Sequence, residues 1–276
     1  MITRCIIGGS RLAGLDGGND LLDLESIFRL AKLAKGKIGI GVKQRAEVIE
    51  KNIIEARRLG LPEIAIYEDP RQLCLDLRER RLCAAVRGTL SSSELLAAMK
   101  EIYNVDRVLR VALLSTAEGK PFFLAPVGID EGNSFDERFE LMMQGTKYLK
   151  CLGVKPTIAV LSKGRAEDGP RGESISRSLA EGDRLVEKAR ELGLEAHHRH
   201  ILIEQAVNEA DFIIAPDGVS GNLIFRTLYF LGGGSAIGAP VVNIGRVFID
   251  TSRDKRSYTD SLAFAAALCA ARESKK

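Results

Sequence analysis

The residues best suited to bind an anion lie in the segment Ala215–Asn222 (APDGVSGN), between an apolar run and a predicted helix. Its glycines let backbone amides approach a ligand, and the N-terminus of a helix attracts negative charge. We therefore expect a phosphate or pyrophosphate to contact Asp217, Gly218, Gly221 and Asn222. The alternative is a tight strand-to-helix turn in which Asp217 or Ser220 caps the helix.

A second group of polar residues precedes another predicted helix, in Ala84–Glu94 (AAVRGTLSSSE). An arginine, a glycine and several hydroxyls before a helix could form a nest of donors around an anion. The candidate ligands are Arg87, Gly88, Thr89 and Ser91. Taken alone, capping of the helix by serine explains the same residues.

A third segment, Asp250–Asp260 (DTSRDKRSYTD), precedes the last predicted helix. The guanidinium group of Arg253 is a fork-shaped donor suited to a phosphate dianion. Asp260 lies in the opening turn of the helix, where its carboxylate could accept a proton or merely complement the helix dipole. Taken alone, this segment favours the structural role.

Two further loops are rich in glycine or charge. Gly232–Val241 (GGGSAIGAPV) is either a ligand-contacting loop or, more commonly for such a composition, a flexible connector. The loop Ser162–Ser174 (SKGRAEDGPRGES) carries basic side chains that could contact phosphate, although charged loops are usually only solvated; these side chains are Lys163, Arg165 and Arg171.

All three histidines fall in one short segment, His197–His200 (HHRH). In a strand, His198 and His200 share one face and His197 points to the other. No second cluster of metal ligands accompanies them, so we expect a solvated edge strand rather than a metal site. No Cys-His or Ser-His-Asp spacing predicts a covalent nucleophile.

The cysteines and the apolar runs indicate the compartment. Five scattered cysteines without a C-x-x-C pair predict neither a disulfide framework nor a zinc knuckle: Cys5, Cys74, Cys83, Cys151 and Cys269. The first 14 residues hold too few apolar side chains for a signal-peptide core. No apolar run reaches the roughly 18 residues of a membrane span. We therefore expect a cytoplasmic protein without a membrane segment.

The charges exclude one class of partner. The 40 basic and 37 acidic residues give a net charge of +3, and the two signs are interspersed along the sequence. A nucleic-acid-binding surface needs a basic stripe or patch, so no nucleic-acid partner is expected.

These candidate segments must be positioned by strands that alternate with helices. The predicted strands are short apolar runs at Lys37–Val42, Glu63–Tyr67, Leu82–Val86, Val108–Leu114, Phe122–Val127, Thr157–Leu161, Phe212–Ala215 and Val241–Ile244. The predicted helices cover Gln44–Gly60, Pro70–Arg80, Ser91–Tyr103, Phe135–Leu152, Gly172–Leu192, the residues after Gly218, and Tyr258–Ala271. Strands without polar alternation, separated by helices, predict a parallel sheet covered on both faces, and their number favours two α/β domains with a cleft between them.

Taken in order, the candidate segments resemble the phosphate acetyl/butyryl transferases. In that family a strand ending in a Pro-Asp element leads into a glycine-asparagine helix start and then a glycine-rich turn, which Ala215–Asn222 and Gly232–Pro240 match. Val86–Leu96 resembles the family's serine-glycine phosphate loop, and Thr157–Gly164 resembles its strand before the mid-domain loop. The D-G-x-x-G-N core is also similar to that of the fatty-acid phosphate acyltransferases.

The variant details resemble most closely the methanogenesis marker protein 4 (Mtx subunit X) family, compact relatives of these transferases in methanogenic archaea. The resemblance implies a two-domain, three-layer α/β/α fold of the isocitrate/isopropylmalate dehydrogenase-like (phosphotransacetylase-like) type. Residues 1–105 and 240–276 would form a discontinuous first domain, with residues 106–239 as an inserted second domain.

The resemblance also implies roles for three residues. In the transferases the CoA thiolate attacks an acyl phosphate and releases inorganic phosphate. By motif, Asp260 would deprotonate the thiol, Arg253 would hold the phosphate and Ser252 would steady the tetrahedral intermediate. CoA is then a candidate substrate, with no bound cofactor and no metal expected.

The sequence departs from the transferase pattern at several points. One extra residue separates Arg253 from Asp260, and Asp254 and Lys255 replace the small residues that usually follow the serine-arginine pair. Arg87 stands where the transferases keep a serine. The pocket is expected to survive these changes with an altered substrate.

Two functions from different classes follow. The first is a phosphate acyltransferase-like enzyme, a homodimer by analogy, acting on an acyl phosphate, phosphate or CoA. The second is a non-catalytic subunit or regulator of a methanogenic methyltransferase complex that retains the pocket and binds methyltransferase partner subunits. A methyltransferase in its own right is less favoured, because no glycine-rich methyl-donor fingerprint follows an early strand.

Overall fold

The structure is a computed structural model that describes residues 24–273, so Cys5 and the rest of the first 23 residues lie outside the described part. The helices are α1 Leu24–Ala31, α2 Ala46–Arg58, α3 Pro70–Arg78, α4 Ser92–Tyr103, α5 Phe135–Cys151, α6 Glu173–Glu191, α7 Ile203–Glu209, α8 Gly218–Phe230 and α9 Thr259–Glu273, with a 3₁₀ helix η1 at Ala166–Arg171. The strands are β1 Ile38–Gly41, β2 Ile64–Tyr67, β3 Ala84–Val86, β4 Ala112–Ser115, β5 Pro121–Ala125, β6 Ile158–Leu161, β7 Ala196–His200, β8 Phe212–Ile214, β9 Ser235–Pro240 and β10 Val247–Asp250.

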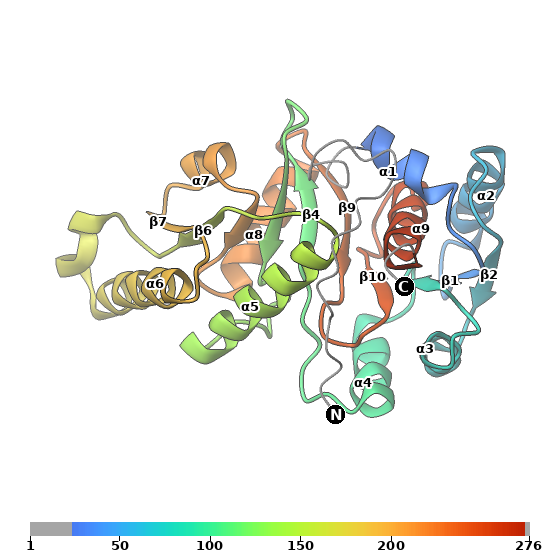
Figure 1. Ribbon diagram of the computed structural model, residues 1–276, viewed down its shortest axis with the longest axis horizontal. Coiled ribbons are helices and arrows are strands. Elements are labelled where there is room, and N and C mark those ends of the chain that lie inside the picture. Colours follow the sequence, from blue (N-terminus) through green and yellow to red (C-terminus); the bar gives the residue numbers. More distant parts are fainter. Residues whose placement is uncertain (1–23, 274–276) are drawn as a thin grey trace.

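The strands form one sheet in the order β2-β1-β3-β10-β9-β4-β5-β8-β6-β7, which runs along the length of the molecule with helices on both sides (Figure 1). The group β2-β1-β3-β10 is parallel, and so is the group β5-β8-β6-β7. Between them, β9 is antiparallel to both β10 and β4, and β4 is antiparallel to β5. The α/β fold class is confirmed, whereas the expectation of an all-parallel sheet was wrong at its centre.

The antiparallel centre arises from β9, which the sequence analysis treated as a loop. A run of small residues interrupted by glycine has the composition of a connector. In the structure Gly238 has φ +156°, and a Cβ there would lie 2.3 Å from the Cγ2 atom of Ile249. Glycine therefore permits a close approach between β9 and β10. The strand predicted at Val241–Ile244 was also wrong, since these residues turn the chain from β9 into β10.

Distant parts of the sequence meet in the β2-β1-β3-β10 half, where the C-terminal strand and helix lie beside the first strands (Figure 1). Helix α9 is buried continuously from Ser261 to Ala271, as a helix that is largely apolar on every side must be. Helix α1 packs against it. The residue bounds of a two-domain division stay a prediction.

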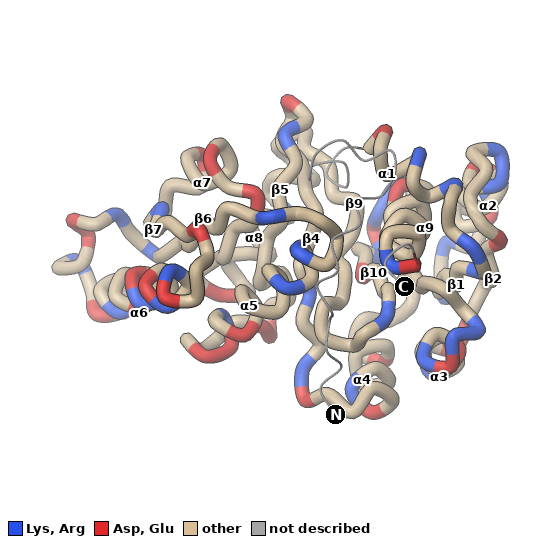
Figure 2. Tube along the Cα trace, in the orientation of Figure 1, with Lys and Arg blue, Asp and Glu red and all other residues tan. Residues whose placement is uncertain are grey.

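Basic and acidic residues are mixed along the outer helices, with no single-sign stripe in the view of Figure 2. Between Leu24 and Glu273, no helix combines the length and the apolar character that crossing a membrane requires.

Candidate functional site

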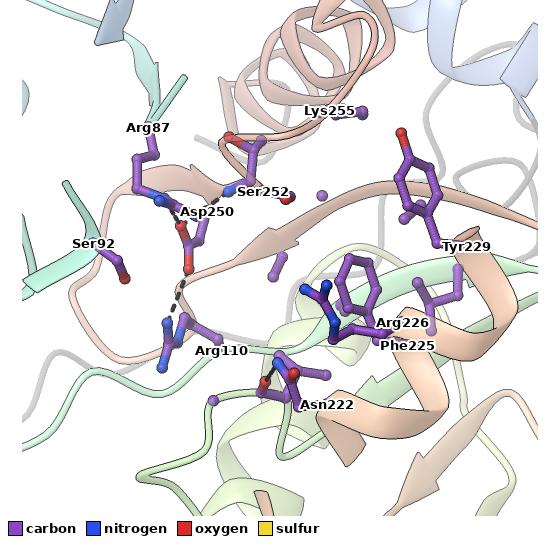
Figure 3. Close-up of a pocket in the computed structure, with 18 of the residues that line it drawn as sticks. Arg87, Ser92, Arg110, Asn222, Phe225, Arg226, Tyr229, Asp250, Ser252 and Lys255 are labelled. Atoms are coloured by element: carbon purple, nitrogen blue, oxygen red, sulfur yellow. Dashed lines mark hydrogen bonds and ion pairs between the residues drawn. The ribbon is translucent and has the colours of Figure 1, made fainter. Parts of the chain in front are cut away.

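A cleft of about 380 Å³ lies where the two halves of the sheet meet. One wall comes from the β3–α4 loop and the end of β10, the opposite wall from α8 and the β5–α5 loop, and the floor from β4 and β9 (Figure 3). Its polar lining is Arg87, Ser92, Arg110, Asp130, Asn222, Arg226, Tyr229, Asp250, Thr251, Ser252 and Lys255. The floor is made of small or aliphatic residues, which leaves room for an apolar group of a ligand: Ala112, Leu113, Leu114, Ala236, Gly238 and Ala239.

Two buried arginines from opposite halves meet at one carboxylate in this cleft. Arg87, just after β3, donates from Nε to Oδ1 of Asp250. Arg110, just before β4, donates from its NH1 nitrogen to Oδ2 of the same residue, at 3.0 Å. Figure 3 shows the two guanidinium groups on either side of the carboxylate. The side chains are only 8 to 12% exposed, so this bridge ties the two halves together away from bulk water.

The bridge fixes the charge state of its carboxylate. Burial alone would raise the pKa of Asp250, but Arg87 and Arg110 outweigh burial and hold that pKa below its usual value. The amide of Thr251 also donates to Oδ1, at 2.9 Å. Asp250 is therefore a carboxylate at neutral pH, as the pairing of a buried charge requires.

The second arginine is enclosed by further acidic groups. Nε of Arg110 donates to Oε1 of the buried Glu131 at 2.6 Å, and its NH2 nitrogen lies 3.4 Å from Oδ1 of Asp130. The other oxygen of Glu131 accepts hydrogen bonds from the amides of Val127 and Gly128. The β5–α5 loop is thus anchored to the arginine that lines the cleft.

Lys255, a buried residue that follows β10, also lines the cleft. The Nζ atom of Lys255 donates to the carbonyl of Ile237 at 2.9 Å, to Oδ1 of Asp260 at 2.7 Å and to Oγ of Ser261 at 2.7 Å. All three ammonium donors thus have acceptors. Burial lowers the pKa of Lys255 and the ion pair with Asp260 opposes this effect.

Helix α8 presents the opposite wall. Its face toward the cleft carries Asn222, Phe225, Arg226 and Tyr229, at the spacing of successive helical turns (Figure 3). The rings of Phe225 and Tyr229 are stacked with centroids 5.9 Å apart. Among the residues that the structure describes, no carboxylate pairs with Arg226, and its guanidinium carbon lies 5.0 Å from the Phe230 ring centroid. This wall combines aromatic surface with an unneutralised cation.

Of the residues predicted around α8, only Asn222 lines the cleft. Asp217 caps the helix by accepting from the amide of Ser220 at 2.8 Å, and it pairs with Lys163 at 3.0 Å. A Cβ at Gly218 would lie 1.9 Å from the Gly128 carbonyl oxygen, and one at Gly221 would lie 1.9 Å from that of Pro126. The two glycines thus serve close packing of the β5–α5 loop on the helix.

Of the residues predicted after β3, some line the cleft and others only hold the loop in place. Arg87 lines the cleft, and Ser92 does so in place of Ser91. Gly88 has φ +59°, and a Cβ at this position would lie 2.1 Å from the Gly41 carbonyl oxygen. The hydroxyl of Thr89 is buried and accepts from the amides of Lys43 and Gln44 at 3.0 and 3.1 Å. Gly88 and Thr89 therefore hold the loop against β1.

The three residues with roles implied by the resemblance are not gathered in the cleft. Ser252 lines it. Arg253 is exposed and outside the cleft lining, and its backbone carbonyl accepts from Tyr258. Asp260 lies behind Lys255, also outside the lining. Their catalytic roles stay predictions.

The sequence analysis missed Arg110, Asp250 and Arg226. Asp250 stood at the edge of a segment already singled out, but its strand was not predicted. Arg110 lies inside an apolar run, where a charged residue signals a paired, buried group. Arg226 is the single charged residue of α8, another signal that was available.

The remaining candidates lie away from the cleft. Arg171 pairs with Asp168 at 2.9 Å within the loop after β6. The histidine segment forms β7, the edge strand, as expected, and the rings of His198 and His200 stack on one face, 4.2 Å apart. The His198 side chain is only 7% exposed rather than solvated, and it is hydrogen-bonded to Asp183 at 2.7 Å and to Ser162 at 3.0 Å. Within residues 24–273, no group of three or more His, Cys, Asp or Glu side chains could hold a metal ion.

Comparison with known proteins gives close relatives by sequence, although no family model matches the chain. A Methanosarcina mazei protein described as "Putative methyltransferase mtx subunit X" is 39% identical over 264 residues, covering 89% of this chain and 94% of the relative. A Methanosarcina acetivorans protein of the same description is 40% identical with the same coverage. An "Uncharacterized methyltransferase" of Methanocaldococcus jannaschii is 30% identical over 78% of this chain and 90% of its own.

Solved structures share the fold at low sequence identity. A branched-chain phosphotransacylase from Enterococcus faecalis gives a TM-score of 0.68 at 18% identity, over 85% of this chain and 99% of the other. A phosphotransacetylase from Streptococcus pyogenes gives 0.63 at 16% identity, over 91% and 99%. The expected phosphotransacetylase-like fold is thereby confirmed.

Proposed function

We propose that the cleft of this chain, which belongs to the mtx subunit X family, binds an acidic acyl metabolite of the acyl phosphate or CoA class and transfers its acyl group. The observation that carries the proposal is the cleft itself. It sets the hydroxyl of Ser252 and the guanidinium group of Arg226, which has no acidic partner among residues 24–273, over an apolar floor between the two halves of the fold. Such a pocket suits a ligand with an anionic end and an apolar end.

In the proposed reaction the CoA sulfur forms a bond to the acyl carbon, and the bond from that carbon to the phosphate oxygen breaks. The electron pair of the broken bond leaves with inorganic phosphate. Oγ of Ser252 accepts from the amide of Asp254 at 3.2 Å, so its own hydrogen is available to donate to the developing oxyanion. The resemblance assigns the thiol proton to Asp260, which lies behind Lys255 and outside the cleft lining, so the proton would have to pass Lys255 to reach it.

The test follows the loss of CoA thiol when the purified protein meets acetyl, propionyl or butyryl phosphate. We expect turnover that Ser252→Ala reduces about 100-fold, the size typical of a lost oxyanion donor. Ser176→Ala, at an exposed serine of α6, is the matched control and should turn over as the wild type does. Arg253→Ala tests the role that the resemblance implies. Absence of turnover with every acyl phosphate would contradict the transferase proposal.

A second candidate is a non-catalytic subunit that retains the cleft as a ligand sensor, linked to methanogenesis. The observation that favours it is the Lys255–Asp260 pair, because the predicted base is held by a buried ammonium group and lies outside the cleft lining. Stability that rises with CoA or acyl phosphate, without turnover, would support this candidate. Co-purification with methyltransferase subunits from a native lysate would identify its partner, and light scattering would test the proposed homodimer.

A further inference from the structure

Arg87 and Arg110 are the cations that a phosphate entering the cleft would be expected to meet, yet both are already engaged. Asp250 accepts from each of them through a different oxygen. The NH1 nitrogen of Arg87 also donates to the Leu90 carbonyl at 3.2 Å. Each of the three nitrogens of Arg110 faces a carboxylate oxygen. Few donors of this pair remain for a ligand.

The charge of the cluster leads to the same conclusion. Two guanidinium groups meet the carboxyl groups of Asp250, Asp130 and Glu131, so the cluster has no surplus positive charge whether Glu131 is ionised or not. A phosphate dianion placed here would lie beside Asp250, and like charges at such separations repel. Asp250 therefore fills the position of an anionic ligand between the two arginines.

The cation left for a ligand lies on the other wall. Arg226 projects from α8 into the cleft and is exposed, and within residues 24–273 no acidic partner neutralises it (Figure 3). Lys255, the remaining cation of the lining, has all three donors engaged by Ile237, Asp260 and Ser261.

We infer that Asp250 is a built-in competitor that keeps free phosphate off the arginine pair, and that Arg226 is the residue that binds the acidic group of the ligand. This inference rests on the proposed function for the ligand class. It adds that recognition depends on the organic part of the ligand together with Arg226, so that inorganic phosphate alone binds weakly. Asp250 thus determines specificity by excluding an abundant anion that shares the ligand's chemistry.

The test measures the binding of inorganic phosphate and of CoA by calorimetry to the wild type, Asp250→Asn and Arg226→Ala. Asp250→Asn removes the competing charge at nearly constant shape, so phosphate should bind it about tenfold more tightly than it binds the wild type. Arg226→Ala should weaken CoA binding about tenfold, as the loss of a charge-assisted contact does. Arg58→Ala, at an exposed arginine of α2, is the matched control and should leave both affinities unchanged.

Should Asp250→Asn be too unstable for calorimetry, its melting temperature with and without phosphate gives the same information. Phosphate that replaces the lost carboxylate should raise that temperature more than it raises the temperature of the wild type. The inference about Asp250 would be overturned if phosphate bound or stabilised Asp250→Asn no more strongly than the wild type. The assignment of Arg226 would be overturned if Arg226→Ala bound CoA as tightly as the wild type. A wild type that binds neither CoA nor any acyl phosphate would instead count against the proposed function.

Discussion

Titration of Asp250 should make the stability of this protein depend on pH. Its unfolded pKa is near 3.8, and the two arginines lower the folded value despite burial. Its contribution is therefore present above about pH 4 and is lost as pH falls through the lower folded pKa. The difference in unfolding free energy between the wild type and Asp250→Asn, measured in urea, should be constant above about pH 5 and shrink below about pH 4. A difference that does not change with pH would contradict this account.

Asp260 should stabilise the folded protein by neutralising the buried Lys255. Asp260→Asn leaves the buried ammonium of Lys255 without its counter-ion and should lower the unfolding free energy by about 3 kcal/mol. The double variant Lys255→Met/Asp260→Asn should recover part of that loss, because it removes the stranded charge. Glu173→Gln, which breaks the exposed pair with Arg177, is the control and should change stability by less than about 0.5 kcal/mol. If Asp260→Asn and Glu173→Gln have equal effects, the buried pair does not stabilise the fold.

The packing of helix α8 against the β5–α5 loop depends on two glycines, Gly218 and Gly221. An alanine in an exposed helix normally stabilises by about 1 kcal/mol relative to glycine. At Gly221 the added Cβ would lie 1.9 Å from a backbone oxygen of Pro126, so the helix or the loop must shift. Gly221→Ala should therefore destabilise by about 3 kcal/mol, as overpacking does, in chemical denaturation. Val219→Ala, at an exposed position of the same helix, should have a small effect, and a Gly221→Ala protein as stable as the wild type would show that the loop is free to move.

The elements also show how far the sequence alone could predict this fold. Strands with continuous apolar runs, such as β6, and helices with a clear apolar stripe, such as α2, were predicted because burial determines their pattern. Strand β9 was not, because Gly238 and its small neighbours have the composition of a loop and become a strand only through pairing with β10 and β4. The same tertiary pairing brings Asp250 to the arginines. The sequence could therefore indicate Arg87, Asn222 and Ser252 as lining residues, but not the Asp250 carboxylate that bridges Arg87 and Arg110.

In the whole molecule, the cleft lies where the two parallel groups of strands in the continuous sheet are joined by antiparallel strands. Arg87 and Asp250 come from one half, whereas Arg110 and α8 come from the half beyond β9. A ligand in the cleft contacts both halves, so binding should couple to the stability of the whole fold rather than to one half alone.

A calorimetric titration of CoA and butyryl phosphate into the wild type and into Ala239→Leu tests directly whether the cleft binds the ligand. Ala239 lies in the floor of the cleft, and a leucine there would fill the space without changing any charged residue. Ala97→Leu, at an exposed position of α4, is the matched control. We predict binding to the wild type and to Ala97→Leu, and loss of binding in a folded Ala239→Leu protein. Undiminished binding to Ala239→Leu would show that the ligand binds elsewhere and would contradict the proposed site.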